Sequence, residues 1–168
     1  MDDETLRSLA TFPERLDRHY RLIPASYKSW APPSWDGVPS EALTAIEQVW
    51  HVLDIEVEGY YPRFQKTLAE VDPCLESLDT YALARERHYK DRDGAEALAA
   101  FRQARSRTVE LLSTVRPEQW LRTARFDGYG SVTLRGLVHY LCSHDQQHLS
   151  GLQWLLGKIA SEAKPRAS

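Results

Sequence analysis

The chain has 168 residues and a mass of 19.3 kDa, which is the size of one ordinary domain that can bury its core without a disulfide or a structural metal. Its 42% hydrophobic and 27% charged content is typical of a soluble globular protein and excludes a disordered tail protein or a collagen-like fibre. A net charge of −3 and a pI near 6.1 offer no positive surface for nucleic acid, so we expect no nucleic-acid partner.

The sequence also carries no sign of export or membrane insertion. It lacks the run of about 18 apolar residues that a membrane span requires. The segment Met1-Asp2-Asp3-Glu4 is acidic, whereas the start of a secretory signal is basic. Cys74 and Cys142 are too few for a disulfide framework and are not in CxxC spacing. These features predict a cytoplasmic protein that makes no contact with a membrane.

The first predicted helix spans residues 3–21, with Pro13 in its middle expected to kink or divide it. Its apolar residues recur at helical intervals, at Leu6, Leu9, Leu16 and Tyr20. Residues 24–39 are rich in proline and predict a loop. Trp30 and Trp35 lie in this loop, where they either cap one end of the core or line the mouth of a pocket.

A second, longer helix is predicted over residues 40–70, with Ser40 as its N-cap and a kink at Pro62. Its apolar residues follow steps of three and four: Leu43, Ile46, Trp50, Leu53, Val57, Tyr61, Phe64 and Leu68. Residues 71–93 look irregular or weakly helical and end on a turn signal at Asp93-Gly94. This stretch predicts a long connection between the second and third helices.

The remaining helices are predicted over residues 95–114 and 133–158, and residues 126–132 between them form a loop or a small extended piece. Arg102, Arg105 and Arg107 are placed on the outer face of the third helix, where such a charge run is usually solvated.

No segment predicts a confident strand pair, so the expected fold is an all-α four-helix bundle with a long irregular connection between helices 2 and 3. We expect a single domain over residues 1–168, with its core at about 10–158 and a frayed tail at 161–168.

Two of the six histidines, His144 and His148, stand four residues apart. On a helix this spacing puts both imidazoles on one face, about 6 Å apart along the axis, so they can converge on one ion. Both fall within the leucine stripe of the last predicted helix, whereas His139 projects outward. A pair of hydrogen-bonded core histidines fits the same pattern, because buried imidazoles need partners. The residues alone leave both interpretations open.

His51 is the natural third ligand, because metal sites in bundles are assembled from facing helices. It lies roughly 130° from the centre of its helix's apolar stripe, so it reaches the interior only if that helix is buried between two neighbours. Glu47, Asp54 and Glu58 lie on the same side. One of them could orient the imidazole, or all three could form a solvated acidic edge.

Two segments of this chain resemble the DinB-like (YfiT-like) metalloenzymes. Residues 50–56, Trp-His-Val-Leu-Asp-Ile-Glu, look like that family's H-x-x-D/E-x-E run in the second helix. Residues 144–148, His-Asp-Gln-Gln-His, look like its H-D-x-x-H pair in the last helix of a four-helix bundle. Trp35 and the segment Gly130-Ser131-Val132-Thr133-Leu134 are also similar to family features. The resemblance covers about residues 10–158.

The resemblance implies that His51, His144 and His148 bind a divalent metal, zinc or nickel. Members of the DinB-like family with a known activity catalyse thiol-dependent transfer with low-molecular-weight thiols, isomerisation or hydrolysis. We therefore expect a metal-dependent thiol S-transferase or hydrolase that acts on a small molecule, with a low-molecular-weight thiol as a further cofactor in the first case. The resemblance also favours a homodimer.

Three imidazoles leave a coordination position for a water or a thiol, whose pKa a divalent ion lowers toward neutrality. Asp145 points roughly 100° away from His144 and is expected either to support the site by hydrogen bonding or to pair with an arginine in the core. Tyr140, one turn before His144, could donate a proton or simply pack. Cys142 lies away from the ligand face and is predicted to be a packed thiol.

Two other classes of function remain open. One is a bundle that binds a metal or small ligand without catalysis, such as a stress-associated binding protein, and the other is a metal-free dimerisation module. No G-x-S-x-G elbow, phosphate-binding loop or dinucleotide fingerprint occurs, which disfavours serine hydrolase and nucleotide chemistry.

Overall fold

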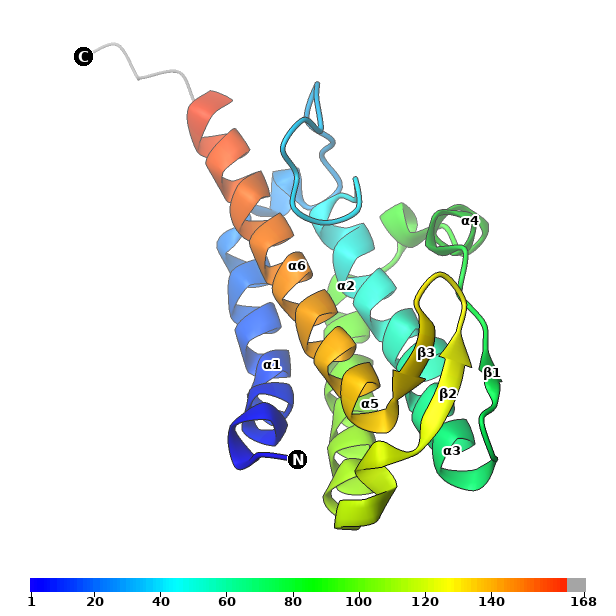
Figure 1. Ribbon diagram of the computed structural model, residues 1–168. Coiled ribbons are helices and arrows are strands. Elements are labelled where there is room, and N and C mark those ends of the chain that lie inside the picture. The colour runs from blue at the N-terminus through cyan, green and yellow to red at the C-terminus, as the bar shows by residue number, and fades with distance from the viewer. Residues whose placement is uncertain (163–168) are drawn as a thin grey trace, which may run out of the picture.

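A computed structural model of the protein describes residues 1–162 and confirms the predicted four-helix bundle (Figure 1). The bundle is built from α1 (Asp3–Leu22), α2 (Ala45–Asp54) with its continuation, α5 (Gly94–Ser113) and α6 (Leu134–Glu162). Pro13 lies inside α1 without dividing it. Ser161 and Glu162 belong to α6, and the rest of the predicted frayed tail, residues 163–168, lies outside the described residues.

The second predicted helix differs from its expected course at both ends of α2. It begins at Ala45 rather than at residue 40, because the Glu47 carboxylate accepts hydrogen bonds from the Thr44 backbone N–H and hydroxyl, at 2.8 and 2.7 Å. After Asp54 the chain widens into one π-helical segment, Ile55–Tyr60, and then continues as α3, Tyr61–Ala69. Pro62 falls in the first turn of α3, where a missing N–H is tolerated. The change of helix type therefore lies just before the expected kink.

The connection between α3 and α5 holds more regular structure than its sequence indicates. It contains β1 (Cys74–Leu75), α4 (Thr80–Glu86) and a 3₁₀ turn at Tyr89–Asp91. A second 3₁₀ turn, Pro117–Leu121, follows α5, and a third, Ala25–Tyr27, follows α1.

No confident strand pair was predicted, but the structure contains a small sheet, part of which falls in the predicted loop or extended piece at residues 126–132. β2 (Thr123–Phe126) pairs antiparallel with β3 (Gly130–Thr133), and β1 pairs parallel with β2, so the sheet order is β1-β2-β3. Gly128 and Gly130 take φ values of +79° and +75°, the left-handed backbone that glycine favours at a hairpin turn. Strands of two to four residues are too short to show a period of two.

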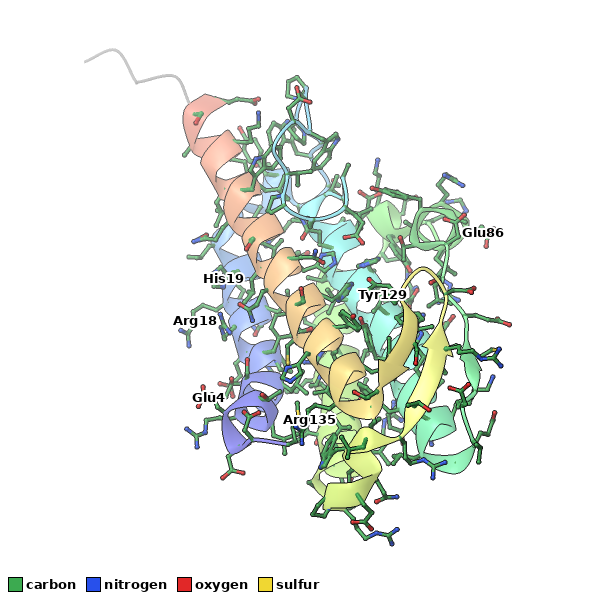
Figure 2. The ribbon with its side chains drawn as sticks, viewed as in Figure 1. Glu4, Arg18, His19, Glu86, Tyr129 and Arg135 are labelled. Atoms are coloured by element: carbon green, nitrogen blue, oxygen red, sulfur yellow. The ribbon has the colours of Figure 1, made fainter. Side chains whose placement is uncertain are left out.

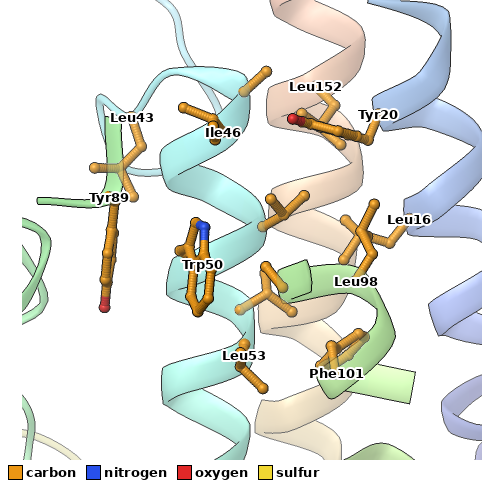
Figure 3. Close-up of a cluster of buried hydrophobic side chains, with 14 of the residues drawn as sticks. Leu16, Tyr20, Leu43, Ile46, Trp50, Leu53, Tyr89, Leu98, Phe101 and Leu152 are labelled. Atoms are coloured by element: carbon orange, nitrogen blue, oxygen red, sulfur yellow. The ribbon is translucent and has the colours of Figure 1, made fainter. Parts of the chain in front are cut away.

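The apolar core runs the length of the bundle. Around Trp50, buried side chains from α1, α2, α5 and α6 interleave (Figure 3). Trp35 stacks on Trp154 with ring centroids 5.8 Å apart, and Trp30 also packs on this core, as the capping interpretation predicts. At the other end, the sheet covers a second apolar cluster that includes Phe64, Trp120 and Leu137. No helix among residues 1–162 is both long and apolar enough to cross a membrane.

Candidate metal centre

Three histidines from two helices meet inside the bundle. Nε2 of His51 on α2 lies 3.0 Å from Nε2 of His144 on α6. The His148 ring centroid lies 4.6 Å from that of His51 and 4.5 Å from that of His144. His51 and His148 are 2% and 0% exposed, respectively. The structure thus brings together all three residues that the sequence singled out.

His51 faces the interior despite its position away from the apolar stripe, because α2 is enclosed on all sides. Every residue of α2 except Glu47 is buried, and α2 lies against both α5 and α6. The remaining histidines lie elsewhere: His88 and His139 are exposed, and His19 lies on α1 (Figure 2). The enclosed position of α2 meets the condition under which the sequence allowed His51 to be a ligand.

A fourth group, Glu41, was not predicted from the sequence. Its two carboxylate oxygens lie 3.3 Å from His148 Nε2 and 3.8 Å from His51 Nε2. One donor atom from each of Glu41, His51, His144 and His148 lies within 4.8 Å of all the others. Glu41 precedes the first turn of α2 because that helix begins later than expected, and no periodicity marks a carboxylate in an irregular segment. Its closeness in sequence to His51 is the one signal that could have found it.

The carboxylates that the sequence proposed as supports for His51 have other partners. Glu47 caps α2, and Asp54 and Glu58 both accept hydrogen bonds from Arg87, each at 2.7 Å. Asp54 also accepts a hydrogen bond from the Tyr89 hydroxyl. The hydrogen bonds of all three carboxylates therefore go to groups other than the imidazoles of the cluster.

The protonation states suit a cation. Burial lowers the pKa of His51 to about 3 and lowers the pKa of His144 well below its ordinary value of 6.5. The neighbouring His148 imidazole lowers the pKa of Glu41 to about 2. At neutral pH the cluster therefore contains unprotonated imidazole rings at positions 51 and 144 and an ionised carboxylate.

Two buried nitrogen atoms of the cluster have no hydrogen-bond partner, Nδ1 of His144 and Nε2 of His148. His148 Nε2 lies near Glu41 but without the alignment of a hydrogen bond. Leaving buried polar atoms unpaired costs about 1–3 kcal/mol each, so such atoms call for an explanation. Imidazole nitrogens with a carboxylate oxygen are donors that zinc, nickel and other divalent transition metals accept. The residues present therefore fit the metal that the sequence implies.

A second buried polar cluster lies beside the histidines. Arg105 on α5 is 1% exposed and donates to Glu56 at 3.0 and 2.9 Å and to Asp145 at 2.7 and 2.9 Å. The prediction of a solvated Arg105 is wrong, because α5 packs between α1 and α2 and carboxylates from other elements meet its arginine. For Asp145, the arginine-pair alternative is the one observed.

This arginine cluster is charged at neutral pH. Burial raises the pKa of Asp145 to about 6. Burial acts to lower the pKa of Arg105, but the charges and hydrogen bonds of Asp145 and Glu56 outweigh it and raise that pKa. Each acidic side chain accepts two hydrogen bonds from the guanidinium, so Glu56 and Asp145 share one cation.

Tyr140 and Cys142 do not join the histidines. Tyr140 is at the surface, and its ring lies 4.7 Å from that of Tyr129. Tyr129 lies on the β2–β3 hairpin (Figure 2). Tyr60 approaches the site instead, with its ring centroid 6.3 Å from that of His144. Cys142 packs on apolar side chains, and burial raises the pKa of its thiol to about 11, as expected for a packed thiol.

The fold and this cluster define a helical bundle with a histidine-rich centre between its second and last long helices. The sequence profile of the DinB superfamily matches residues 4–151, and the chain belongs to that superfamily. None of the curated proteins compared with the chain matches it.

Among solved structures, the chain is similar to YfiT from Bacillus subtilis, which is described as a probable metal-dependent hydrolase with an unusual four-helix bundle topology. The superposition has a TM-score of 0.82 and covers 94% of this chain and 87% of that chain. Sequence identity is 21%, so the similarity establishes the shared fold.

Proposed function

We propose that the protein is a divalent-metal-dependent hydrolase of a small molecule, with His51, His144 and His148 as metal ligands. One observation carries the proposal: three imidazoles meet with buried, unpartnered nitrogen atoms beside an ionised carboxylate. A cluster that served only the fold would be expected to pair those atoms. The description of YfiT as a probable metal-dependent hydrolase supports the same reaction class, and zinc or nickel is the expected ion.

A divalent ion held by these residues supplies Lewis acidity, which polarises a carbonyl or phosphoryl group and acidifies water. The protein supplies the ligands from two rigid helices, which fixes their spacing. Glu41 comes from outside the helices, and its side chain is 29% exposed, whereas the His51 and His148 side chains are 2% and 0% exposed. Glu41 is therefore the most solvent-accessible of these three side chains. We assign its carboxylate the task of accepting a hydrogen bond from the attacking water and so orienting it.

Metal content tests the ligand set. We expect the wild-type protein to hold about one zinc or nickel ion per chain after loading and desalting, as a three-ligand site does. His51→Ala and His148→Ala should lose the ion. His139→Ala is the matched control, because this histidine lies on the same helix as His148 but is exposed. Full metal content in folded His51→Ala protein would refute the ligand set.

Turnover tests the reaction. With p-nitrophenyl esters and phosphodiesters as probes, we expect hydrolysis that a chelator abolishes and that added metal restores. Glu41→Gln should keep the ion and lose about 10²-fold in turnover, the order of magnitude expected when a reacting group is no longer correctly oriented. Unchanged turnover in Glu41→Gln would remove the role of Glu41. Stoichiometric metal without turnover of any probe would favour the non-catalytic binding protein.

A further inference from the structure

A buried amide contacts the ring nitrogen of His148 that faces away from the cluster. Gln48 on α2 and His148 on α6 are both 0% exposed. Gln48 Oε1 lies 3.2 Å from His148 Nδ1. The other ring nitrogen of His148, Nε2, faces Glu41 and has no hydrogen-bond partner. The two nitrogens of this ring therefore have different surroundings.

The orientation of the amide follows from its second contact. Gln48 Nε2 donates to the Leu43 carbonyl oxygen at 3.2 Å, and an amide NH₂ group donates but does not accept. The amide oxygen is thereby directed at His148. Since that oxygen only accepts, His148 Nδ1 must carry the proton. A neutral ring with its proton on Nδ1 has its lone pair on Nε2, on the side of the other histidines.

A missing side chain on α6 makes room for this amide. A Cβ atom at Gly151 would lie 2.6 Å from Gln48 Oε1 and 2.3 Å from Ser40 Oγ. Contacts this short force the amide to move, because real Cβ atoms essentially never approach so closely. By contrast, a Cβ atom at Gly157 on the same helix would have no atom within 4 Å. Gly151 is thus part of the setting of Gln48.

We propose that Gln48, seated against Gly151, is a positioning residue that holds His148 as the Nδ1–H tautomer and so presents its Nε2 lone pair to the metal. Partners of this kind orient metal-bound histidines and fix their tautomer, and their loss typically reduces metal affinity 10–100-fold. The metal in this inference rests on the proposed function, whereas the tautomer itself is a property of the metal-free protein.

The test reads the tautomer directly in metal-free protein. In long-range proton–nitrogen correlation spectra of ¹⁵N-histidine-labelled protein, wild-type His148 should show the Nδ1–H form. Gln48→Met removes the acceptor while keeping an unbranched chain of similar length, and the proton should move to Nε2, toward the Glu41 carboxylate. Gln48→Glu keeps an acceptor and should retain the Nδ1–H form. A wild-type Nε2–H form, or an unchanged tautomer in Gln48→Met, would overturn the proposal.

Zinc affinity provides the second measurement. We expect Gln48→Met to bind zinc 10–100-fold more weakly than wild type and Gln48→Glu to restore most of the affinity. Gly151→Ala should weaken zinc binding in the same way, and Gly157→Ala should match wild type. If wild type shows the Nδ1–H form but binds no zinc, the proposed function fails and the tautomer assignment stands. If wild type binds zinc and Gln48→Met binds it equally well, the positioning role fails alone.

Discussion

The bundle buries two neighbouring polar clusters that are bonded in opposite ways. Glu56 follows His51 by five residues and Asp145 is adjacent to His144, so the same two chain segments supply the imidazoles of one cluster and the carboxylates of the other. In the arginine cluster, each carboxylate receives two hydrogen bonds from Arg105. In the histidine cluster, two buried nitrogens remain unpaired. The arginine cluster therefore satisfies its own polar groups and stabilises the fold. The histidine cluster leaves nitrogen atoms unpaired, and these are free to bind a ligand.

The largest expected effect is on the arginine cluster. Arg105→Met leaves Glu56 and Asp145 buried without their cation, and breaking a buried ion pair in this way costs about 3–5 kcal/mol of unfolding free energy. Urea denaturation of metal-free protein at pH 7 measures the loss. Metal content of the folded variant should stay at the wild-type level, because the hydrogen bonds of Arg105 go to Glu56, Asp145 and the Leu9 carbonyl oxygen rather than to an imidazole of the cluster.

Arg102→Met is the matched control for this change. Arg102 lies on the same helix and has a side chain that is 57% exposed, so its replacement should change the unfolding free energy by less than about 0.5 kcal/mol. An equal loss in both variants would mean that burial of the charge at Arg105 is not the cause.

The second effect concerns the histidine cluster and requires metal. A ligand that binds only the folded protein stabilises it by about 2.7 kcal/mol at a free concentration of a hundred times Kd. Zinc should therefore raise the unfolding free energy of wild type by roughly this amount, and it should leave His144→Ala unchanged. Thermal unfolding with zinc and with a chelator measures both. Equal stabilisation of the two proteins would place the bound zinc elsewhere.

Much of this arrangement was predictable from local sequence. The long helices show apolar residues at steps of three and four, and the i, i+4 spacing of His144 and His148 fixes their common face. His51 was the natural third candidate because it lies in another long helix, and the family resemblance then supported it. Helical periodicity describes one helix at a time, however, and cannot report what surrounds it. That is why helical periodicity placed Arg105 wrongly on a solvated face, and why it could place His51 in the interior only on the condition that its helix is enclosed.

The features that the sequence missed depend on contacts made after folding. Glu41 reaches the histidines from an irregular segment whose path is set by tertiary packing. The π-helical segment at Ile55–Tyr60 adds residues to a helix without any change in the apolar pattern strong enough to reveal it. Strand β1 is held by pairing with β2, which lies far along the chain, with Cys74 opposite Arg125. None of these three features leaves a recognisable pattern in a short stretch of the sequence.

A third, smaller effect separates burial from pairing. Arg87 also lies between two carboxylates, and it binds Glu58 through two hydrogen bonds of 2.7 and 3.0 Å. Its side chain is 33% exposed, so water screens the pair and Arg87→Met should cost only about 1 kcal/mol. Urea denaturation at low and high salt checks this value, and added salt should reduce the difference from wild type. A loss as large as that of Arg105→Met would show that the number of partners, rather than burial, sets the cost.

The smallest expected effect is the response of metal affinity to pH. A site of three exposed imidazoles with ordinary pKa values near 6.5 loses roughly 50-fold in affinity between pH 7.5 and pH 6, because protons compete for the nitrogens. Burial lowers the pKa of His51 to about 3 and that of His144 well below its ordinary value. Both rings stay unprotonated across this interval, so zinc affinity should fall less than about fivefold. Calorimetric titration in buffers of different ionisation enthalpy measures the affinity and the protons released.

In the metal-free protein, the shifted pKa values of His51 and Asp145 make the stability of the fold change with pH in opposite directions. Between pH 3 and 6.5 the unfolded chain binds more protons at His51 than the folded protein does, so acid destabilises the fold through this residue. Asp145 has a raised pKa of about 6 against an ordinary 3.8, so the folded protein binds the extra proton there, and lowering the pH from 6 toward 4 stabilises the fold through this group. As the pH falls, the unfolding free energy of His51→Ala should therefore decrease less than that of wild type, whereas that of Asp145→Asn should decrease more. The same change in slope for both variants would mean that the two clusters do not titrate as separate units.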